Sequence, residues 1–344
     1  MFPIPSRNTL TRLGGKARPW PQSFAAALAV GLPLIAAVLT GKIAMGGLAA
    51  FGALVILHLP ALPGPIPVLR LLGCASAVPT CLVLGQLSAV WPGASLPLFG
   101  AVIAVIVAAT RFAGLPPPGH TLFVLAAGSG AAAGFHAAAL PALVMVPLVS
   151  AAVAIGIGWI AHSLFQPEDS AASTQTPLTG AAAPTPAGEL LIEAAAFGLF
   201  AMLALAIALE IGLDRPYWVP ISCVSVMRGM TLEAVWTRNL QRIAGTLAGV
   251  ACTLALLALH PNQWLAVIVV MSLVLCLART LGQNYALTVL LATPASLLIA
   301  ELASINQIPD FDLLITRVID ITLGSSVGLV GGTLLRLRGT RVSG

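Results

Sequence analysis

Basic side chains at helical spacing are the first candidates for chemistry in this sequence. Arg238 and Arg242 are four residues apart, so they would share one face of a helix. Arg228 precedes them at the end of one apolar run, and Arg279 ends a later one. Like charges on one face repel each other unless lipid phosphate, water or an anionic ligand neutralises them. We therefore expect either contacts with headgroups and cytoplasmic water or a pathway for a small anion.

A second group of charges mixes both signs. Arg317 and Asp320 are three residues apart in the last apolar run, and Asp320 lies deeper in it. Glu210 ends an earlier run on the same predicted side, and Asp214 follows it. An ionisable residue inside a membrane segment is costly and suggests function by default. This group predicts either an ion-pair network between helices or a gate or proton-coupling site, with Asp320 as the best candidate.

Aromatic residues could supply further contacts. Tyr217 and Trp218 suit an interfacial aromatic belt, and they could equally form a stacking surface for an aromatic ligand. Asn284 and Tyr285, at the start of another apolar run, could donate hydrogen bonds to a ligand.

Helix-breaking residues occur at matched positions in the two halves of the chain. If His120 is aligned with Tyr285, Gly128-Ser129-Gly130 falls opposite Thr293-Pro294-Ala295, and Gly46-Gly47 falls near Pro220. Matched interruptions can mark the binding site of a transporter. Gly and Pro are also generally tolerated in membrane helices, which is the other interpretation.

Catalytic and metal-binding motifs are not found. The five cysteines stand singly, without a CxxC pair, and no HExxH, GxSxG or Walker-type motif occurs. We predict no enzymatic activity, no catalytic residue, no cofactor and no metal site.

The composition fixes the fold class. Charged residues make up 8% of the 344 residues, against roughly a quarter in soluble domains, and hydrophobic residues make up 58%. This excludes a soluble globular protein, a disordered chain and a nucleic-acid-binding domain. Since a membrane helix needs about 20 apolar residues, we predict an all-α polytopic membrane protein of about 12 transmembrane helices.

The predicted helices fall into two groups of six. The sequence divides into a basic N-terminus (1–21), a first six-helix repeat (22–162), a Pro-, Ser- and Ala-rich flexible cytoplasmic linker (163–187), a second six-helix repeat (188–336) and a tail (337–344). The predicted spans are 21–40, 43–59, 68–90, 95–111, 119–135, 141–162, 189–212, 216–229, 240–259, 263–278, 283–303 and 313–335. Residues 41–73 and 214–245 share their layout, including Arg-x-x-Gly at the end. Because six is even, the repeats would be parallel.

The loop charges give the orientation. With the N-terminus inside, the inner segments hold thirteen basic residues: Arg7, Arg12, Lys16, Arg18, Arg70, Arg111, Arg228, Arg238, Arg242, Arg279, Arg336, Arg338 and Arg341. The outer segments hold three: Lys42, Arg215 and Arg317. This positive-inside bias predicts that both termini are cytoplasmic.

One stretch resembles a known family. Tyr217-Trp218-Val219-Pro220, a basic connection, and then Gln241-Arg242-Ile243-Ala244-Gly245-Thr246-Leu247-Ala248-Gly249 are similar to the signature of the fusaric-acid-resistance-like family. That family is related to bacterial aromatic acid exporters and, more distantly, to plant aluminium-activated malate transporters. The resemblance implies a bacterial inner-membrane protein that exports aromatic or other organic carboxylates.

These inferences combine into one expected function. We expect an ion-gradient-driven secondary exporter of an organic anion, in which Arg228, Arg238, Arg242 and Arg279 attract the anion from the cytoplasm. The alternatives are a passive anion channel and a non-transporting scaffold subunit. The expected partners are the anion and the lipid bilayer, with no nucleic acid; the oligomeric state is left open.

Overall fold

The computed structural model describes residue 14 and residues 17–59, 68–164, 186–229, 231–300, 302 and 311–342. These residues form helices and connecting turns, with no strand among them. The α-helices are α2 (Trp20–Thr40), α3 (Ile43–Ala53), α4 (Val68–Ser88), α5 (Ser95–Phe112), α6 (Thr121–Ala133), α7 (Leu140–Leu164), α8 (Ala187–Glu210), α9 (Trp218–Met227), α10 (Leu232–Leu257), α11 (Gln263–Thr280), α12 (Tyr285–Ala300) and α13 (Phe311–Val342). Three short 3-10 helices, η1 (Leu54–His58), η2 (Pro92–Ala94) and η3 (Ala137–Ala139), continue or precede them.

Eight of these helices are long and apolar enough to cross a membrane. Large apolar side chains such as Leu69 and Phe112, each 87% exposed, cover the outside of the bundle, as expected where lipid is the solvent. The four shorter apolar helices are α3 with η1, α6, α9 and α12, the second and fifth of each run of six. The protein is a membrane protein. That the four short helices also cross the membrane, giving 12 transmembrane helices in all, stays a prediction.

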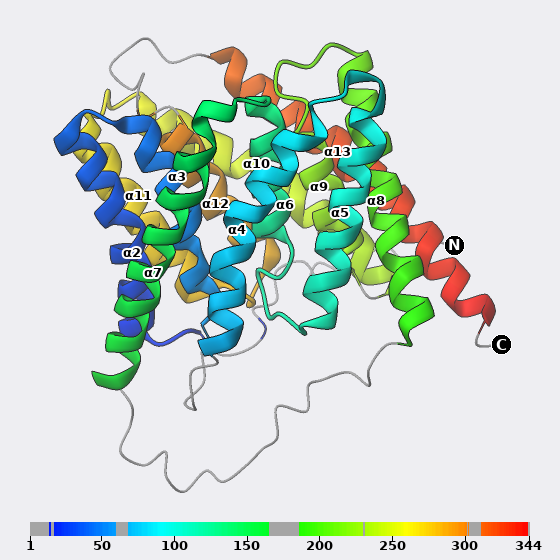
Figure 1. Cartoon of the computed structure of the whole chain (residues 1–344), viewed down its shortest axis with the longest axis horizontal. Coiled ribbons are helices and arrows are strands. Elements are labelled where there is room, and N and C mark those ends of the chain that lie inside the picture. Colours follow the sequence, from blue (N-terminus) through cyan, green and yellow to red (C-terminus); the bar gives the residue numbers. More distant parts are fainter. Residues whose placement is uncertain are drawn as a thin grey trace, which may run out of the picture.

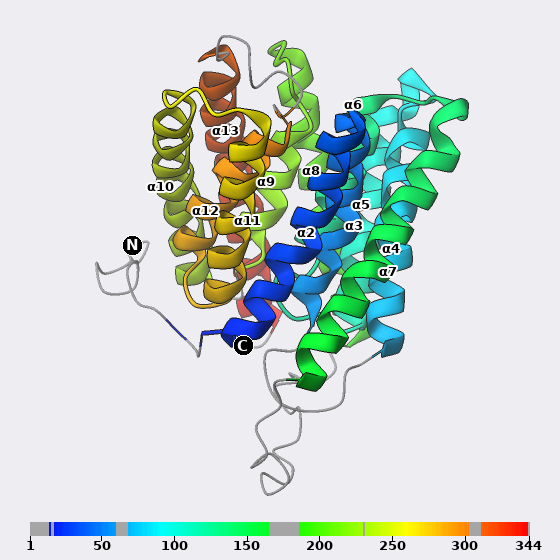
Figure 2. The same ribbon diagram turned by 90° about the vertical axis from the view of Figure 1, so that its left-hand side faces the viewer.

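The helix contacts repeat with an offset of six helices. α4 packs against α6 as α10 packs against α12, and α3 packs against α7 as α9 packs against α13. The halves meet where α5 packs against α8, where α2 packs against α11 and, less extensively, where α6 packs against α9. Figure 2 shows α9–α13 on one side of the bundle and α3–α7 on the other. Two parallel repeats would produce this pattern, and the duplication itself stays a prediction.

Glycines bring several of these helices into close contact. A methyl group on Gly245 of α10 would lie 2.6 Å from the carbonyl oxygen of Ala286 in α12. A methyl group on Gly324 of α13 would lie 2.8 Å from the Cβ of Ser222 in α9, and it would overlap the carbonyl oxygen of Val219 in the same helix. Small residues allow such close packing between membrane helices, and they hold α9 firmly against α13.

The helix ends differ from the predicted spans at two points that affect function. α10 begins at Leu232 and not at residue 240, so Arg238 lies inside a helix and not in a connection. Its start is fixed by Thr231, whose hydroxyl accepts a hydrogen bond from the Ala234 amide at 3.1 Å. α13 runs to Val342, beyond the end of the last predicted span at residue 335.

The ends of the described chain lie at one end of the bundle. Figure 1 shows α2 beginning and α13 ending at the end where α7 stops and α8 starts. An even number of crossings predicts this arrangement. Most of the predicted linker, residues 165–185, and the basic residues Arg7, Arg12 and Lys16 lie outside the described residues.

Candidate functional site

Helix α9 is buried along its whole length and carries the polar face around which the site is built. Every residue from Val219 to Met227 is buried. Trp218, Ser222 and Ser225 follow one another at spacings of four and three, so they share one face. Ser225 donates its hydroxyl hydrogen to the Ile221 carbonyl at 2.7 Å. Arginines from α10 and α13 lie against this face.

Arg242 is held by two neutral hydroxyl groups. Its Nη2 donates to Ser222 Oγ at 3.0 Å, and its Nη1 donates to the Tyr285 hydroxyl at 3.1 Å. The side chain is only 8% exposed. The ion pairs found among the described residues do not include Arg242. A buried charge without a counter-charge is unfavourable, so this guanidinium group is ready to accept an anion.

Arg238 lies one helical turn before Arg242 and uses the same tyrosine. Its guanidinium carbon lies 3.9 Å from the centre of the Tyr285 ring, within cation–π range. Its Nε donates to the Ser225 carbonyl at 3.1 Å. Tyr285 of α12 thus contacts both arginines, one through its hydroxyl group and the other through its ring.

Arg317 and Asp320 of α13 lie next to the first turn of α9. The Arg317 guanidinium carbon lies 3.5 Å from the centre of the Trp218 ring. Both side chains are buried, Arg317 at 6% and Asp320 at 1% exposure. Among the described residues, Arg317 Nε and Nη1 and both Asp320 carboxylate oxygens have no hydrogen-bond partner. The predicted ion pair between them is therefore not formed.

These residues lie along one face of α9, with Asp320 joined to them by its electrostatic interaction with Arg317, and we call them the α9 track. It consists of Trp218, Ser222 and Ser225 of α9, Arg238 and Arg242 of α10, Tyr285 of α12, and Arg317 and Asp320 of α13. It holds three guanidinium groups and one carboxyl group, so its net charge favours an anion. Ser222 and Ser225 were not predicted, because hydroxyl groups in an apolar run carry no sequence signal by themselves.

Arg228 lies beyond the predicted inner end of the α9 track and binds a loop. Its Nη1 donates to the Pro118 carbonyl at 2.7 Å. Burial, together with the charges of Arg238 and Arg111, lowers the pKa of Arg228 to about 10, so it stays charged at neutral pH. In the same loop, burial and the nearby Arg228 lower the pKa of His120 well below its usual value, which keeps the ring neutral.

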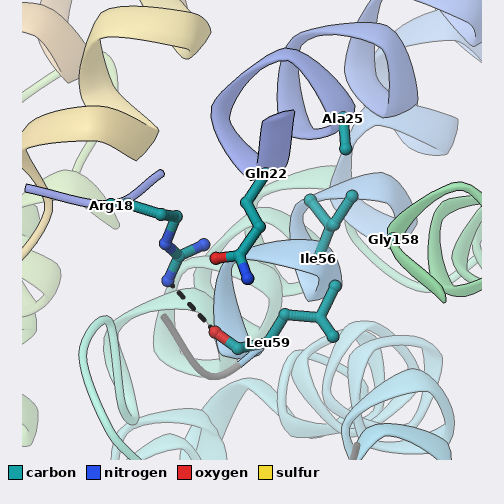
Figure 3. Close-up of a pocket in the computed structure, with 6 residues that line it drawn as sticks. All are labelled: Arg18, Gln22, Ala25, Ile56, Leu59 and Gly158. Atoms are coloured by element: carbon teal, nitrogen blue, oxygen red, sulfur yellow. Dashed lines mark hydrogen bonds between the residues drawn. The ribbon is translucent and has the colours of Figure 1, made fainter. Parts of the chain in front are cut away.

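Arg279 is not on the α9 track. It donates to the carbonyl of Arg18 and lies over the Trp20 ring, 4.2 Å from its centre. Arg18 in turn lines a small hollow together with Gln22, Ile56 and Leu59, as Figure 3 shows. Its Nη2 donates to the carbonyls of Leu57 and Leu59 at 3.0 and 3.2 Å. The two arginines hold the segment before α2 against η1 and α11.

The remaining predicted polar residues also lie away from the α9 track. Tyr217 packs edge-on against Phe99, with ring centres 5.6 Å apart. The Asn284 side chain caps α12 by accepting a hydrogen bond from the Leu287 amide at 3.2 Å. Glu210 and Asp214 are exposed near the end of α8.

The predicted helix breaks are wrong. α6 is continuous through Ser129, and α12 is continuous through Thr293 and Pro294. Pro220 lies in the first turn of α9, where its missing N–H leaves no helical bond unmade. The glycines of α6 instead serve packing, since Gly130 touches the α4 backbone at Leu82. No exposed backbone ends at mid-helix are available to bind an anion at these positions.

A half-buried ion cluster that the sequence analysis missed ties three helices together. Glu193 of α8 pairs with Arg111 at 2.7 Å and with Arg336 at 3.2 Å. Arg336 also donates to the Gly229 carbonyl at 2.9 Å. Glu193 in the first turns of an apolar helix was the available signal. No group of three metal-binding side chains occurs in the part of the chain that the structure describes.

The two Arg-x-x-Gly segments have different environments. Arg242 is buried among hydroxyl groups, whereas Arg70, at the matching position of the first half, is exposed. Among the described residues, the buried arginines of the second half are Arg242 and Arg317, whereas that of the first half is Arg18, before α2.

The α9 track lies within the part of the chain that matches a known family model. Residues 201–331, which include the whole α9 track, match the family model described as fusaric acid resistance protein-like. The chain is also 34% identical over 146 residues to the Bacillus subtilis (strain 168) protein described as uncharacterized membrane protein YvaC. That match covers 42% of this chain and 23% of the relative. No solved structure matches the chain. The predicted resemblance to the fusaric-acid-resistance-like family is therefore confirmed over residues 201–331 of this membrane protein.

Proposed function

We propose that the protein is a secondary transporter, and not an enzyme, that exports small organic anions across the bacterial inner membrane under an ion gradient. The observation that carries this proposal is the pair Arg242, which is buried, and Arg238, which is half-buried. Among the described residues, the hydrogen-bond and ring partners found for these two guanidinium groups in the α9 track are neutral. The cytoplasmic position of both termini is part of the same proposal.

A carboxylate is the anion that best fits these groups. The planar guanidinium group pairs with a carboxylate through two parallel hydrogen bonds. Tyr285 and Ser222, which accept from Arg242, could turn their hydroxyl hydrogens toward a bound carboxylate oxygen. Lipid phosphate is less well suited because Arg242 is 8% exposed and faces α9. The preference for aromatic carboxylates rests on the family resemblance.

Transport by purified protein in liposomes tests the proposal. We expect uptake of labelled aromatic carboxylates, compared with aliphatic ones, into vesicles that contain the protein. Arg242→Gln should reduce uptake at least about tenfold, since one charge-assisted interaction is worth more than about 1.4 kcal/mol. Arg70→Gln is the matched control and should transport normally, because Arg70 is exposed. Equal uptake by the two variants would remove the α9 track from the proposal.

The same vesicles separate the proposal from its two alternatives. A gradient-driven exporter accumulates the anion against its own gradient when a pH difference is imposed. A passive channel only dissipates an existing anion gradient. A scaffold subunit moves no anion in either experiment.

A further inference from the structure

Asp320 is a carboxyl group in a position that disfavours its charge. It is 1% exposed, and among the described residues neither of its oxygens accepts a hydrogen bond. An ionised carboxylate that is buried without a donor is strongly unfavourable, so such groups take up a proton or bind a cation. Arg317 is three residues away; in the part of the chain that the structure describes, its Nε and Nη1 donate no hydrogen bond, and its guanidinium group rests over Trp218.

The charged surroundings of Asp320 come from several elements. α13 packs against α8, α9 and α10. The charged groups that act on Asp320 are Arg317 on its own helix, and Arg215 and Asp214 in the connection between α8 and α9. From α10, Arg242 acts on Arg317. On α9 the nearby titratable side chain is Cys223, which is fully buried, and on α8 Glu193 is bound by Arg111 and Arg336.

We infer that Asp320 reversibly binds a proton and thereby controls whether Arg317 can bind an anion. When a carboxyl oxygen of Asp320 has taken a proton from water, the group is neutral, and Arg317 stays over Trp218 with two N–H groups free. When that proton returns to water, the carboxylate draws these N–H groups to itself. The proton occupancy of Asp320 is in this way coupled to the anion affinity of Arg317.

This inference extends the proposed function and depends on it for the identity of the anion. Arg317 lies toward the predicted outer end of the α9 track, and its electrostatic interaction with Arg242 shows that the two are neighbours. Protonation of Asp320 would therefore shift the favoured place of the anion from Arg242 toward Arg317. Linkage requires the reverse effect as well, so a bound anion should favour the proton on Asp320.

Infrared spectroscopy of the purified protein tests the proton site without any anion. We expect a C=O stretching band of a protonated carboxyl group that disappears as the pH is raised and is missing in Asp320→Asn. Glu233→Gln, which changes an exposed acid in the first turn of α10, is the matched control and should keep the band. Asp320→Glu should retain the band with a shifted midpoint, which provides a test if Asp320→Asn does not fold. A spectrum that is the same in wild type and Asp320→Asn would overturn the inference.

Anion binding at several pH values tests the coupling, with benzoate as the probe. Wild-type protein should bind benzoate at least about fivefold more tightly at a pH where the carboxyl band is present than at a pH where it has disappeared. About fivefold is the lower end of the usual range for coupling between two sites. Asp320→Asn should bind equally well at every pH, and Arg317→Gln should lose the pH effect but keep the band. An unchanged pH effect in Asp320→Asn contradicts the coupling. If the band behaves as expected but no benzoate binds, the proposed function fails and the proton site stands.

Discussion

Replacing Tyr285 with phenylalanine isolates the hydroxyl group on which Arg242 depends. Arg242 donates to the Tyr285 hydroxyl at 3.1 Å and to Ser222 at 3.0 Å, so the variant removes one of two acceptors. The ring that lies under Arg238 is retained. Hydrogen bonds to charged groups contribute about 1.5–3 kcal/mol each, and a buried donor left without a partner is costly. We therefore expect Tyr285→Phe to lower the free energy of unfolding by about 1.5–3 kcal/mol.

Reversible unfolding in mixed detergent micelles measures this difference. The chain contains only one other tyrosine, Tyr217, which packs against Phe99 away from the α9 track. Tyr217→Phe is therefore the matched control and should change stability by less than about 0.5 kcal/mol. Tyr285→Leu should lose about 0.5–2 kcal/mol beyond Tyr285→Phe, because the cation–π contact with Arg238 is also removed. Wild-type stability in Tyr285→Phe would refute the dependence of Arg242 on this hydroxyl.

Three further predictions concern the rest of the bundle. The pKa of His120 is lowered in the folded protein, so the unfolded chain takes up a proton on this ring more readily than the folded protein does. The free energy of unfolding should therefore fall as the pH drops below about 6.5, by up to about 1.4 kcal/mol per pH unit. In thermal unfolding experiments, His120→Gln should lose less stability than the wild type between pH 8 and pH 5. An equal loss in the two proteins contradicts this prediction. Arg18→Gln should lower the unfolding free energy by about 1.5–3 kcal/mol by removing its hydrogen bonds to the carbonyls of Leu57 and Leu59, the second of which Figure 3 shows, and exposed Arg338→Gln should not. Gly324→Ala should destabilise the protein by about 1–3 kcal/mol, whereas Gly73→Ala, where nothing lies within 4 Å, should not; unchanged stability in Gly324→Ala would rule out tight α9–α13 packing.

Hydropathy predicts the positions of the helices well, because the bilayer requires an apolar surface on every helix that contacts lipid. Each predicted span overlaps one described helix, since long apolar runs are required wherever a helix meets lipid. The start of α10 was missed by eight residues because its first two turns carry Glu233, Arg238 and other polar residues, and their burial against α9 is a tertiary effect. The cap at Thr231 was the local signal for the earlier start.

The residues of the candidate site were predicted in type but not in arrangement. The sequence identifies Arg242 and Arg317 because a charge in or near an apolar run is unusual, and Tyr285 because it begins such a run next to Asn284. Their partners come from helices 20 and 43 residues away in the case of Arg242, and no spacing rule gives such contacts. Arg279 has the same residue type and a similar position, yet it holds the segment before α2. Sequence cannot distinguish these two environments, because packing between distant helices decides them.

Isothermal titration of the purified protein with benzoate is the most direct test of the central claim, that buried arginines along α9 bind a small organic anion. We predict saturable binding by the wild type and by Arg70→Gln, and binding at least about tenfold weaker by Arg242→Gln, equivalent to about 1.4 kcal/mol. Equal affinity in all three proteins, or no binding by the wild type, would contradict the claim.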